Sequence, residues 1–337
     1  MNIAIVHNQV GDHDAPDAKD VLQQAEAVTT ALERLGHRVE RLACTLDLEA
    51  MRAILTQRRP DLVFNLVEEL GGHGRLIHLF PFLLDAMGIA YTGAPAEAIL
   101  LTSNKTMAKE RLRGAGLPTP AWVGPWPENA ARLGGESGQG RWIIKSLWEH
   151  ASIGLGADSV VTTASTAALA GELQRRCPTL GGACFAEEFI DGREFNLSLL
   201  AGPDGPEVLP PAEILFEGFG PEMLRIVDYQ AKWEEDSHAY NHTPRRFDFD
   251  AGDNALLTRL QEIARRCWDA FGLAGYARVD FRVDGNGTPY ILEINTNPCL
   301  SPDAGFAAAV ERAGMDFAQA MARIVADAGR HARRGEH

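Results

Sequence analysis

Two pairs of polar residues near the C-terminal end have types and spacing suited to chemistry: Arg278 with Asp280, and Glu293 with Asn295. Each pair lies in a stretch of alternating residues, and the turn sequence Asp-Gly-Asn-Gly at 284–287 between them predicts a β-hairpin. Side chains two apart on a strand share a face, so the hairpin can bring all four together. Two carboxylates and an amide oxygen suit Mg²⁺, with the arginine facing the charge gathered there. The alternative is a surface hairpin with ordinary polar residues on its solvent side.

The spelling of this segment resembles the ATP-grasp superfamily and, within it, the D-alanine–D-alanine ligase family. That family's closing signature is similar to Arg278-x-Asp280 followed by Glu293-x-Asn295 and a Thr-x-Pro ending. The resemblance implies that Asp280, Glu293 and Asn295 hold two magnesium ions. It also implies that Arg278 stabilises an acyl phosphate and the oxyanion that follows. ATP and Mg²⁺, with Mn²⁺ as a substitute metal, are the cofactors it implies.

Shorter matches to the same family follow in the family's order over nearly the whole chain. Each is weak alone, and their common order strengthens the resemblance. They are Phe64-Asn65-Leu66, Tyr91-Thr92-Gly93, Asn104-Lys105, Gly116 to Pro120, Ile144-Lys145, Glu187 to Ile190, and Gly192 to Phe195.

Nucleotide-binding roles follow from these matches. Lys105 and Lys145 resemble the two lysines that contact the ATP phosphates, where ammonium groups offset charge on the transferred group. Glu187-Glu188-Phe189-Ile190 resembles the linker that meets the adenine edge, and Glu194 resembles the carboxylate that accepts the ribose hydroxyls. A lone lysine is more often a solvated surface group, and the alternative for the two adjacent glutamates is an exposed acidic pair at a strand edge.

The loop at 149–154 resembles the family's glycine and serine loop, whose backbone amides close over the phosphates. Ser152 and Gly154 fit that pattern. His150 stands where glycine is usual, and Ala151 stands where a substrate-side serine is usual.

Lys232 resembles the lysine of the family's mobile loop, which covers the active site and reaches the γ-phosphate. A lid that excludes water would protect an acyl phosphate from hydrolysis. The alternative is a lysine on a solvated loop. With Arg278 and Ser152, Lys232 makes up the candidate catalytic set.

The positions that would grip an amino-acid substrate depart from the family. The first loop lacks the family's glycine, serine and glutamate; Asp14, Asp17 or Asp20 could supply a carboxylate, or could simply face a helix dipole. Cys299 and Ala304 stand where glycine and serine are usual. We therefore hypothesise that the ligase chemistry is retained and that the substrate differs.

The expected function is ATP-dependent ligation of a carboxylate to an amine through an acyl phosphate, with an amino acid or a short peptide as substrate. One alternative is a genuine D-alanine–D-alanine ligase, and another is a small-molecule kinase. A non-catalytic ATP-binding regulatory protein is the alternative from another class. The resemblance makes a homodimer the default assembly.

The elements that must position these residues alternate strand and helix patterns up to about residue 95, which predicts an open parallel sheet. The first turn lacks the GxGxxG spacing of a dinucleotide site. The resemblance implies an α/β and α+β ATP-grasp fold, with nucleotide between two subdomains. The expected parts are an N-terminal α/β domain over 1–100, a central subdomain over 101–186, a C-terminal catalytic subdomain over 187–330 and a tail over 331–337.

Strand patterns are predicted in the middle of the chain, and helices return at 254–271 and 317–328. Further strands are predicted at 89–91 and 208–215. The glycine-rich stretch 134–140 and the charged stretch 217–244 are predicted surface loops.

The chain of 337 residues carries a net charge of -14 with a pI near 5.2, so it should repel nucleic acids and anionic membranes. No apolar run approaches the roughly 18 residues of a membrane helix, and no cationic leader opens the chain, so a cytoplasmic location is expected. Five cysteines without a CxxC pair predict neither a zinc site nor a disulfide framework.

Overall fold

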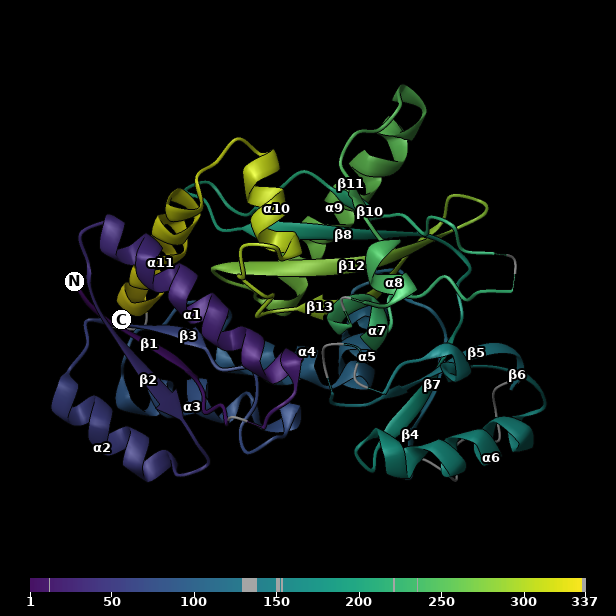
Figure 1. Cartoon of the computed structure of the whole chain (residues 1–337), viewed down its shortest axis with the longest axis horizontal. Helices are drawn as coiled ribbons and strands as arrows, with labels where there is room; N and C mark the ends of the chain where they lie inside the picture. Colours follow the sequence, from purple (N-terminus) through teal and green to yellow (C-terminus); the bar gives the residue numbers. More distant parts are fainter. Residues whose placement is uncertain are drawn as a thin grey trace.

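The structure, a computed structural model, describes residues 1–11, 13–128, 138–149, 152, 154–220, 222–234 and 236–334 (Figure 1). Several sequence-based expectations lie outside the described residues. These concern His150 and Ala151, the carboxylate of Asp17, most of the stretch 134–140 and the end of the tail.

A parallel three-stranded sheet forms the N-terminal unit, in the order β2-β1-β3. Strands β1 and β3 are short and mostly apolar, β3 is buried along its whole length, and β2 is largely exposed. The predicted strand at 89–91 is reduced to a single bridge between Val63 and Tyr91, because the chain turns at Gly93 and enters the next helix. The elements are β1 (Asn2–Asn8), α1 (Pro16–Arg34), β2 (Arg38–Cys44), α2 (Leu48–Arg58), β3 (Leu62–Leu66) and α3 (Leu79–Met87).

An antiparallel four-stranded sheet, in the order β4-β7-β5-β6, lies at the other end of the molecule in Figure 1. Helix α6 covers it, and the buried Leu169 and Leu173 of this helix pack with Trp142 and Ile144 of the sheet. The sequence analysis did not predict α6. The elements are β4 (Trp122–Trp126), β5 (Gln139–Ser146), β6 (Val160–Ala164), α6 (Thr166–Arg176) and β7 (Cys184–Glu188).

An antiparallel six-stranded sheet, in the order β11-β10-β8-β12-β13 with β9 beside β8, lies between these two units (Figure 1). The predicted single strand 208–215 is divided into two, because Pro210 and Pro211 cannot donate ladder hydrogen bonds. Helix α9 (Asn254–Phe271) has the predicted bounds and packs on one face. The strands are β8 (Gly192–Leu200), β9 (Glu207–Val208), β10 (Ala212–Ile214), β11 (Arg245–Arg246), β12 (Tyr276–Asp284) and β13 (Pro289–Asn295).

Helices join these units across long stretches of sequence. Helices α4 (Ala96–Ser103) and α5 (Lys105–Gly114) bury Ile99 and Leu112 in the core of the six-stranded sheet. Helices α10 (Gly305–Arg312) and α11 (Phe317–Arg334) return to the N-terminal sheet. The C-terminal end of α11 therefore lies near the N-terminus in Figure 1. The domain boundaries given above remain predictions, and these two cores extend across them.

Two short helices, α7 (Tyr229–Trp233) and α8 (His238–Asn241), lie inside the predicted surface loop 217–244. Asp228 caps α7 by accepting a hydrogen bond from the Ala231 amide at 2.9 Å. Across the described part of the chain, no helix combines the length and apolar character needed to span a membrane.

Candidate functional site

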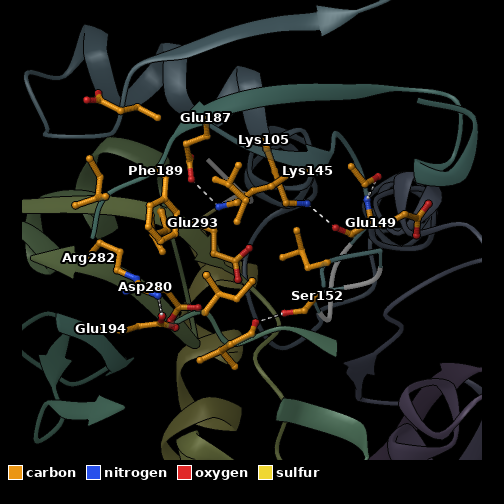
Figure 2. Close-up of a pocket in the computed structure, with 18 of the residues that line it drawn as sticks. Lys105, Lys145, Glu149, Ser152, Glu187, Phe189, Glu194, Asp280, Arg282 and Glu293 are labelled. Atoms are coloured by element: carbon orange, nitrogen blue, oxygen red, sulfur yellow. Dashed lines mark hydrogen bonds and ion pairs between the residues drawn. The ribbon is translucent and has the colours of Figure 1, made fainter. Parts of the chain in front are cut away.

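A cavity of about 830 Å³, its open mouth included, lies between the four-stranded and the six-stranded sheets (Figure 2). All the predicted site residues except Arg278 and Asn295 line it. The lining residues are Lys105, Ile143, Lys145, Ser146, Glu149, Ser152, Leu155, Glu187, Glu188, Phe189, Ile190, Glu194, Ile226, Val227, Lys232, Asp280, Arg282, Leu292 and Glu293.

A buried carboxylate on β7 holds two ammonium groups. Glu187 lies 2.6 Å from the Nζ of Lys145 on β5 and 2.5 Å from the Nζ of Lys109 on α5. Burial by itself would raise the pKa of Glu187, but the two lysines outweigh it and hold that pKa below its usual value. Lys109 was not predicted, although it lies one helical turn beyond Lys105 on α5.

Lys105 enters the cavity from the first position of α5. Asn104 fixes that helix end, because its side chain accepts a hydrogen bond from the Met107 amide at 3.0 Å. The Lys105 ammonium donates to the Glu149 carbonyl at 2.5 Å, as Figure 2 shows. Burial lowers the pKa of Lys105 to about 8; Glu293 opposes this shift, and Lys145 adds to it.

The hairpin of β12 and β13 brings its four polar residues together as predicted. Arg278 pairs with Asn295 in the strand register, and Asp280 pairs with Glu293. Arg278 grips both oxygens of Asp280, at 2.7 and 2.8 Å. The Asn295 amide donates to Asp280 at 3.1 Å and to Glu293 at 3.2 Å. Asn196 of β8, which was not predicted, donates to Asp280 at 2.8 Å.

The oxygen atoms of Asp280, Glu293 and Asn295 suit a hard cation. Burial raises the pKa of Asp280 in spite of Arg278, and the like charge of Glu293 adds to that effect, so a bound cation would relieve the crowding. Among the described residues, no three His, Cys, Asp or Glu side chains gather as a metal site. The available set is therefore the carboxylates of Asp280 and Glu293 and the amide oxygen of Asn295, which leaves positions for water and phosphate oxygens.

Glu194 and Arg282 form an ion pair on the cavity floor, 2.8 Å apart and nearly closed to solvent (Figure 2). They are directly opposite each other on β8 and β12. Burial raises the pKa of Glu194, and Arg282 opposes that rise. The sequence analysis missed Arg282, although period two places it on the same face as Arg278 and Asp280.

The linker residues differ in exposure. Glu187 is 1% exposed, so the exposed-pair alternative does not describe it, whereas the side chain of Glu188 is exposed. The Phe189 amide donates to the Arg141 carbonyl at 3.0 Å, and the Arg141 guanidinium lies 4.6 Å from the centre of the Phe189 ring. Ile190 follows Phe189 along the same wall.

Two segments cover the cavity and contact each other: the first contains Ser152 and Leu155, and the second, called the covering segment below, is the stretch 225–233. The Ser152 hydroxyl donates to the Val227 carbonyl at 2.9 Å, and the Tyr229 amide reaches the Leu155 carbonyl at 3.4 Å. Lys232 lies on α7 in the second segment and lines the cavity. Ser152 and Lys232 therefore line the same cavity.

The residues predicted to face an amino-acid substrate lie on and before α1 and in the stretch that follows β13. Asp20 accepts hydrogen bonds from the Cys299 thiol at 2.9 Å and the Ser301 hydroxyl at 2.7 Å. Burial, followed by the Asp20 charge, raises the pKa of Cys299 well above its usual value. Asp14 bonds the Gly11 amide instead, and Ala304 offers no side-chain cap to α10.

Three comparisons with known proteins bear on this site. The sequence model of the family described as "D-ala D-ala ligase C-terminus" matches residues 143–326. A D-alanine–D-alanine ligase of Synechococcus sp. (strain JA-2-3B'a(2-13)) is 30% identical over 310 residues, which is 90% of this chain and 86% of that protein. The D-alanine–D-alanine ligase of Moorella thermoacetica is 31% identical over 314 residues, or 90% and 93% of the two chains.

A solved structure is similar over the whole chain. The crystal structure of D-alanine–D-alanine ligase from Bacillus anthracis complexed with ATP has a TM-score of 0.72 at 18% identity. The match covers 99% of both chains. The arrangement of the three sheets is therefore shared with that protein.

Proposed function

This chain belongs to the D-alanine–D-alanine ligase family, and we propose that it joins an amino-acid or short-peptide carboxylate to an amine, using substrates other than two D-alanines. It is an ATP-dependent, ADP-forming ligase of the ATP-grasp fold. One observation carries this proposal. Lys105, Lys145 and Lys232 share a single cavity with Asp280 and Glu293, the arrangement needed to hold a polyphosphate beside a metal site.

The nucleotide end of the proposed site lies along β7 and β8. Glu187 to Ile190 would meet the adenine, and Glu194 would accept the ribose hydroxyls. Lys105 and Lys145 would contact the phosphates. Because Glu187 also holds Lys145, the phosphate-binding cation is fixed in place before the nucleotide arrives.

A divalent cation, Mg²⁺ or Mn²⁺, held by Asp280, Glu293 and Asn295 would offset charge on the phosphate oxygens. The substrate carboxylate attacks the γ-phosphorus of ATP in line, and an acyl phosphate and ADP result. Lys105, Lys145 and Lys232 neutralise charge on the transferred group. Ser152 helps to hold the cover that excludes water, through its hydrogen bond to the opposite segment.

Arg278 acts in the second half of the reaction. A neutral amine attacks the carbonyl carbon of the acyl phosphate, and the guanidinium stabilises the oxyanion before phosphate leaves and the amide forms. Asp280 holds Arg278 through two hydrogen bonds, so the guanidinium is oriented before the substrate binds. A protein that only binds ATP has no use for this oriented arginine, which disfavours the regulatory alternative.

The substrate proposal rests on the region around Asp20, where the sequence departs from the family pattern. This carboxylate is already engaged by Cys299, Ser301 and Gln24, so its free capacity to bind a substrate ammonium is reduced. The genuine D-alanine–D-alanine ligase remains the alternative within the family. A cytoplasmic homodimer is part of the same proposal, and light scattering of the purified protein tests the dimer.

The test is ADP release from ATP and Mg²⁺, first with D-alanine alone and then with a panel of amino acids and dipeptides, followed by mass spectrometry of the products. We expect weak release with D-alanine and an amide product with another pair. Robust D-alanyl-D-alanine synthesis would contradict the substrate proposal. ADP release that needs no amine would instead identify a kinase.

A further inference from the structure

Arg282 is a buried arginine inside the nucleotide cavity that neither the metal site nor the phosphate-binding lysines use. Its side chain is 4% exposed and that of its partner Glu194 is 11% exposed. A buried arginine is costly unless its donors are satisfied, and it persists where its fork of donors is needed. Its partners therefore indicate what it positions.

The guanidinium of Arg282 joins strand β8 to the segment around Arg225. It lies 2.8 Å from the Oε2 atom of Glu194, donates to the Gly192 carbonyl at 2.9 Å, and donates to the Arg225 carbonyl. Its Cζ atom lies 5.4 Å from the centre of the Phe216 ring. One side chain thus connects the floor of the cavity to the segment that covers it.

The position of Gly192 fits this arrangement. Its φ is 155°, and a Cβ atom there would lie 2.0 Å from the Val283 carbonyl, so only glycine allows the turn to approach β12 so closely. That close approach brings the Gly192 carbonyl to Arg282. The turn also begins β8 two residues before Glu194, so the backbone and the side chain of this strand are both held by Arg282.

The covering segment is held from the same point. The carbonyl of Arg225 accepts from Arg282, and the next two residues, Ile226 and Val227, line the cavity. The Val227 carbonyl in turn accepts a hydrogen bond from the Ser152 hydroxyl. The position of the cover over the nucleotide therefore depends on the Arg282 side chain.

We propose that Arg282 is a positioning residue for the ribose of ATP, which aims the Glu194 carboxylate at the sugar hydroxyls and anchors the segment 225–227 above them. This inference rests on the proposed ribose contact of Glu194. The recorded contact of Arg282 uses the Oε2 atom, and a carboxylate has capacity for several more hydrogen bonds, so Glu194 can hold the arginine and the ribose together.

The test measures binding of a non-hydrolysable ATP analogue and its 2′-deoxy form by calorimetry, which requires no amino-acid substrate. We expect the wild type to bind the ribose form about tenfold more tightly, since a hydrogen bond to a charged acceptor is lost in the deoxy form. In Arg282→Met the ratio should fall to about one. Arg193→Met is the matched control, because Arg193 holds Glu213 through an ion pair on the same sheet, away from the cavity lining.

The outcomes distinguish the positioning role of Arg282 from the ribose contact of Glu194 on which it rests. If Glu194→Gln keeps the wild-type ratio, the ribose role of Glu194 is wrong and the inference falls with it. If Glu194→Gln loses the ratio while Arg282→Met keeps it, Arg282 alone is misassigned. Should Arg282→Met not fold, Arg282→Lys is measured instead; it keeps the charge but cannot reach three acceptors, so a ratio equal to wild type would overturn the inference.

Discussion

Lys105 is a cation held close to the point where it loses its charge. Burial lowers its pKa to about 8, and the phosphates of a bound nucleotide would raise that pKa again by adding negative charge beside the ammonium group. ATP therefore binds best to the protonated form. The affinity for ATP should be at its full value below about pH 8 and should fall as the pH rises above it.

Calorimetric titration of ATP from about pH 7 to about pH 10 measures this dependence. We expect the wild-type affinity to decline through that range. The variant Lys105→Met should bind weakly at every pH and lack the same decline. A wild-type affinity that stays constant across the range would show that Lys105 does not carry the phosphate contact.

Glu293 is a metal-binding candidate that lines the cavity and lies opposite Asp280 in the strand register. Glu293→Gln keeps the shape of the side chain and removes its charge. Metal-dependent ADP release should fall by about a hundredfold or more, as expected for a lost charged contact. The melting temperature should stay near the wild-type value, as in the exposed control Glu262→Gln. Unchanged ADP release would refute the metal assignment.

The residues that the sequence predicts and those it misses differ in a physical way. Arg278, Asp280, Glu293 and Asn295 follow a local alternation around one turn, so their convergence can be read from the chain. Lys109 and Arg282 find their partners 78 and 88 residues away, at Glu187 and Glu194. Their spacing places Lys109 one helical turn from Lys105 and Arg282 on the strand face of Asp280, but spacing alone does not show that they are buried. Their burial comes from tertiary packing.

At the scale of elements, the pair of Lys109 and Glu187 connects helix α5 to strand β7, and both side chains are 1% exposed. Lys109→Met leaves the buried Glu187 carboxylate with Lys145 as its remaining ion-pair partner among the described residues. Breaking such a buried pair should lower the free energy of unfolding by about 3–5 kcal/mol, measured by urea denaturation. The double variant Lys109→Met with Glu187→Met should recover much of that loss. Equal losses in the single and double variants would contradict the account.

Element boundaries were predictable where periodicity and punctuation agreed. Helix α9 runs over the predicted residues 254–271 because a strong apolar stripe ends at Gly272. The strand at 208–215 was wrong in its continuity because two prolines interrupt it. Helix α6 was missed because Leu169 and Leu173 are its only buried residues in the described chain, which leaves too short an apolar pattern.

At the scale of the whole molecule, the N-terminal core is completed by the C-terminal end of the chain. Phe64 of β3 shares a buried cluster with Tyr276, Phe306, Met321 and Ile324. Sequence patterns could give the strands and helices but not this closure, because it depends on contacts between residues more than 200 positions apart.

This closure predicts that residues 1–100 alone do not form a stable domain, because their core would face solvent where α10 and α11 belong. The isolated segment should show no cooperative thermal transition by circular dichroism. In the whole chain, Met321→Ala should cost about 2–5 kcal/mol in urea denaturation. A cooperative melt of the segment alone would show that the N-terminal core is independent.

The central claim is that this protein forms an amide through an acyl phosphate, and the fate of the carboxylate oxygen tests it most directly. The reaction is run with ATP, Mg²⁺ and amino acids whose carboxylates carry oxygen-18, and the inorganic phosphate is analysed by mass spectrometry. The account predicts that one labelled oxygen moves from the carboxylate to phosphate whenever an amide is formed. Amide formation that leaves the phosphate unlabelled would contradict it.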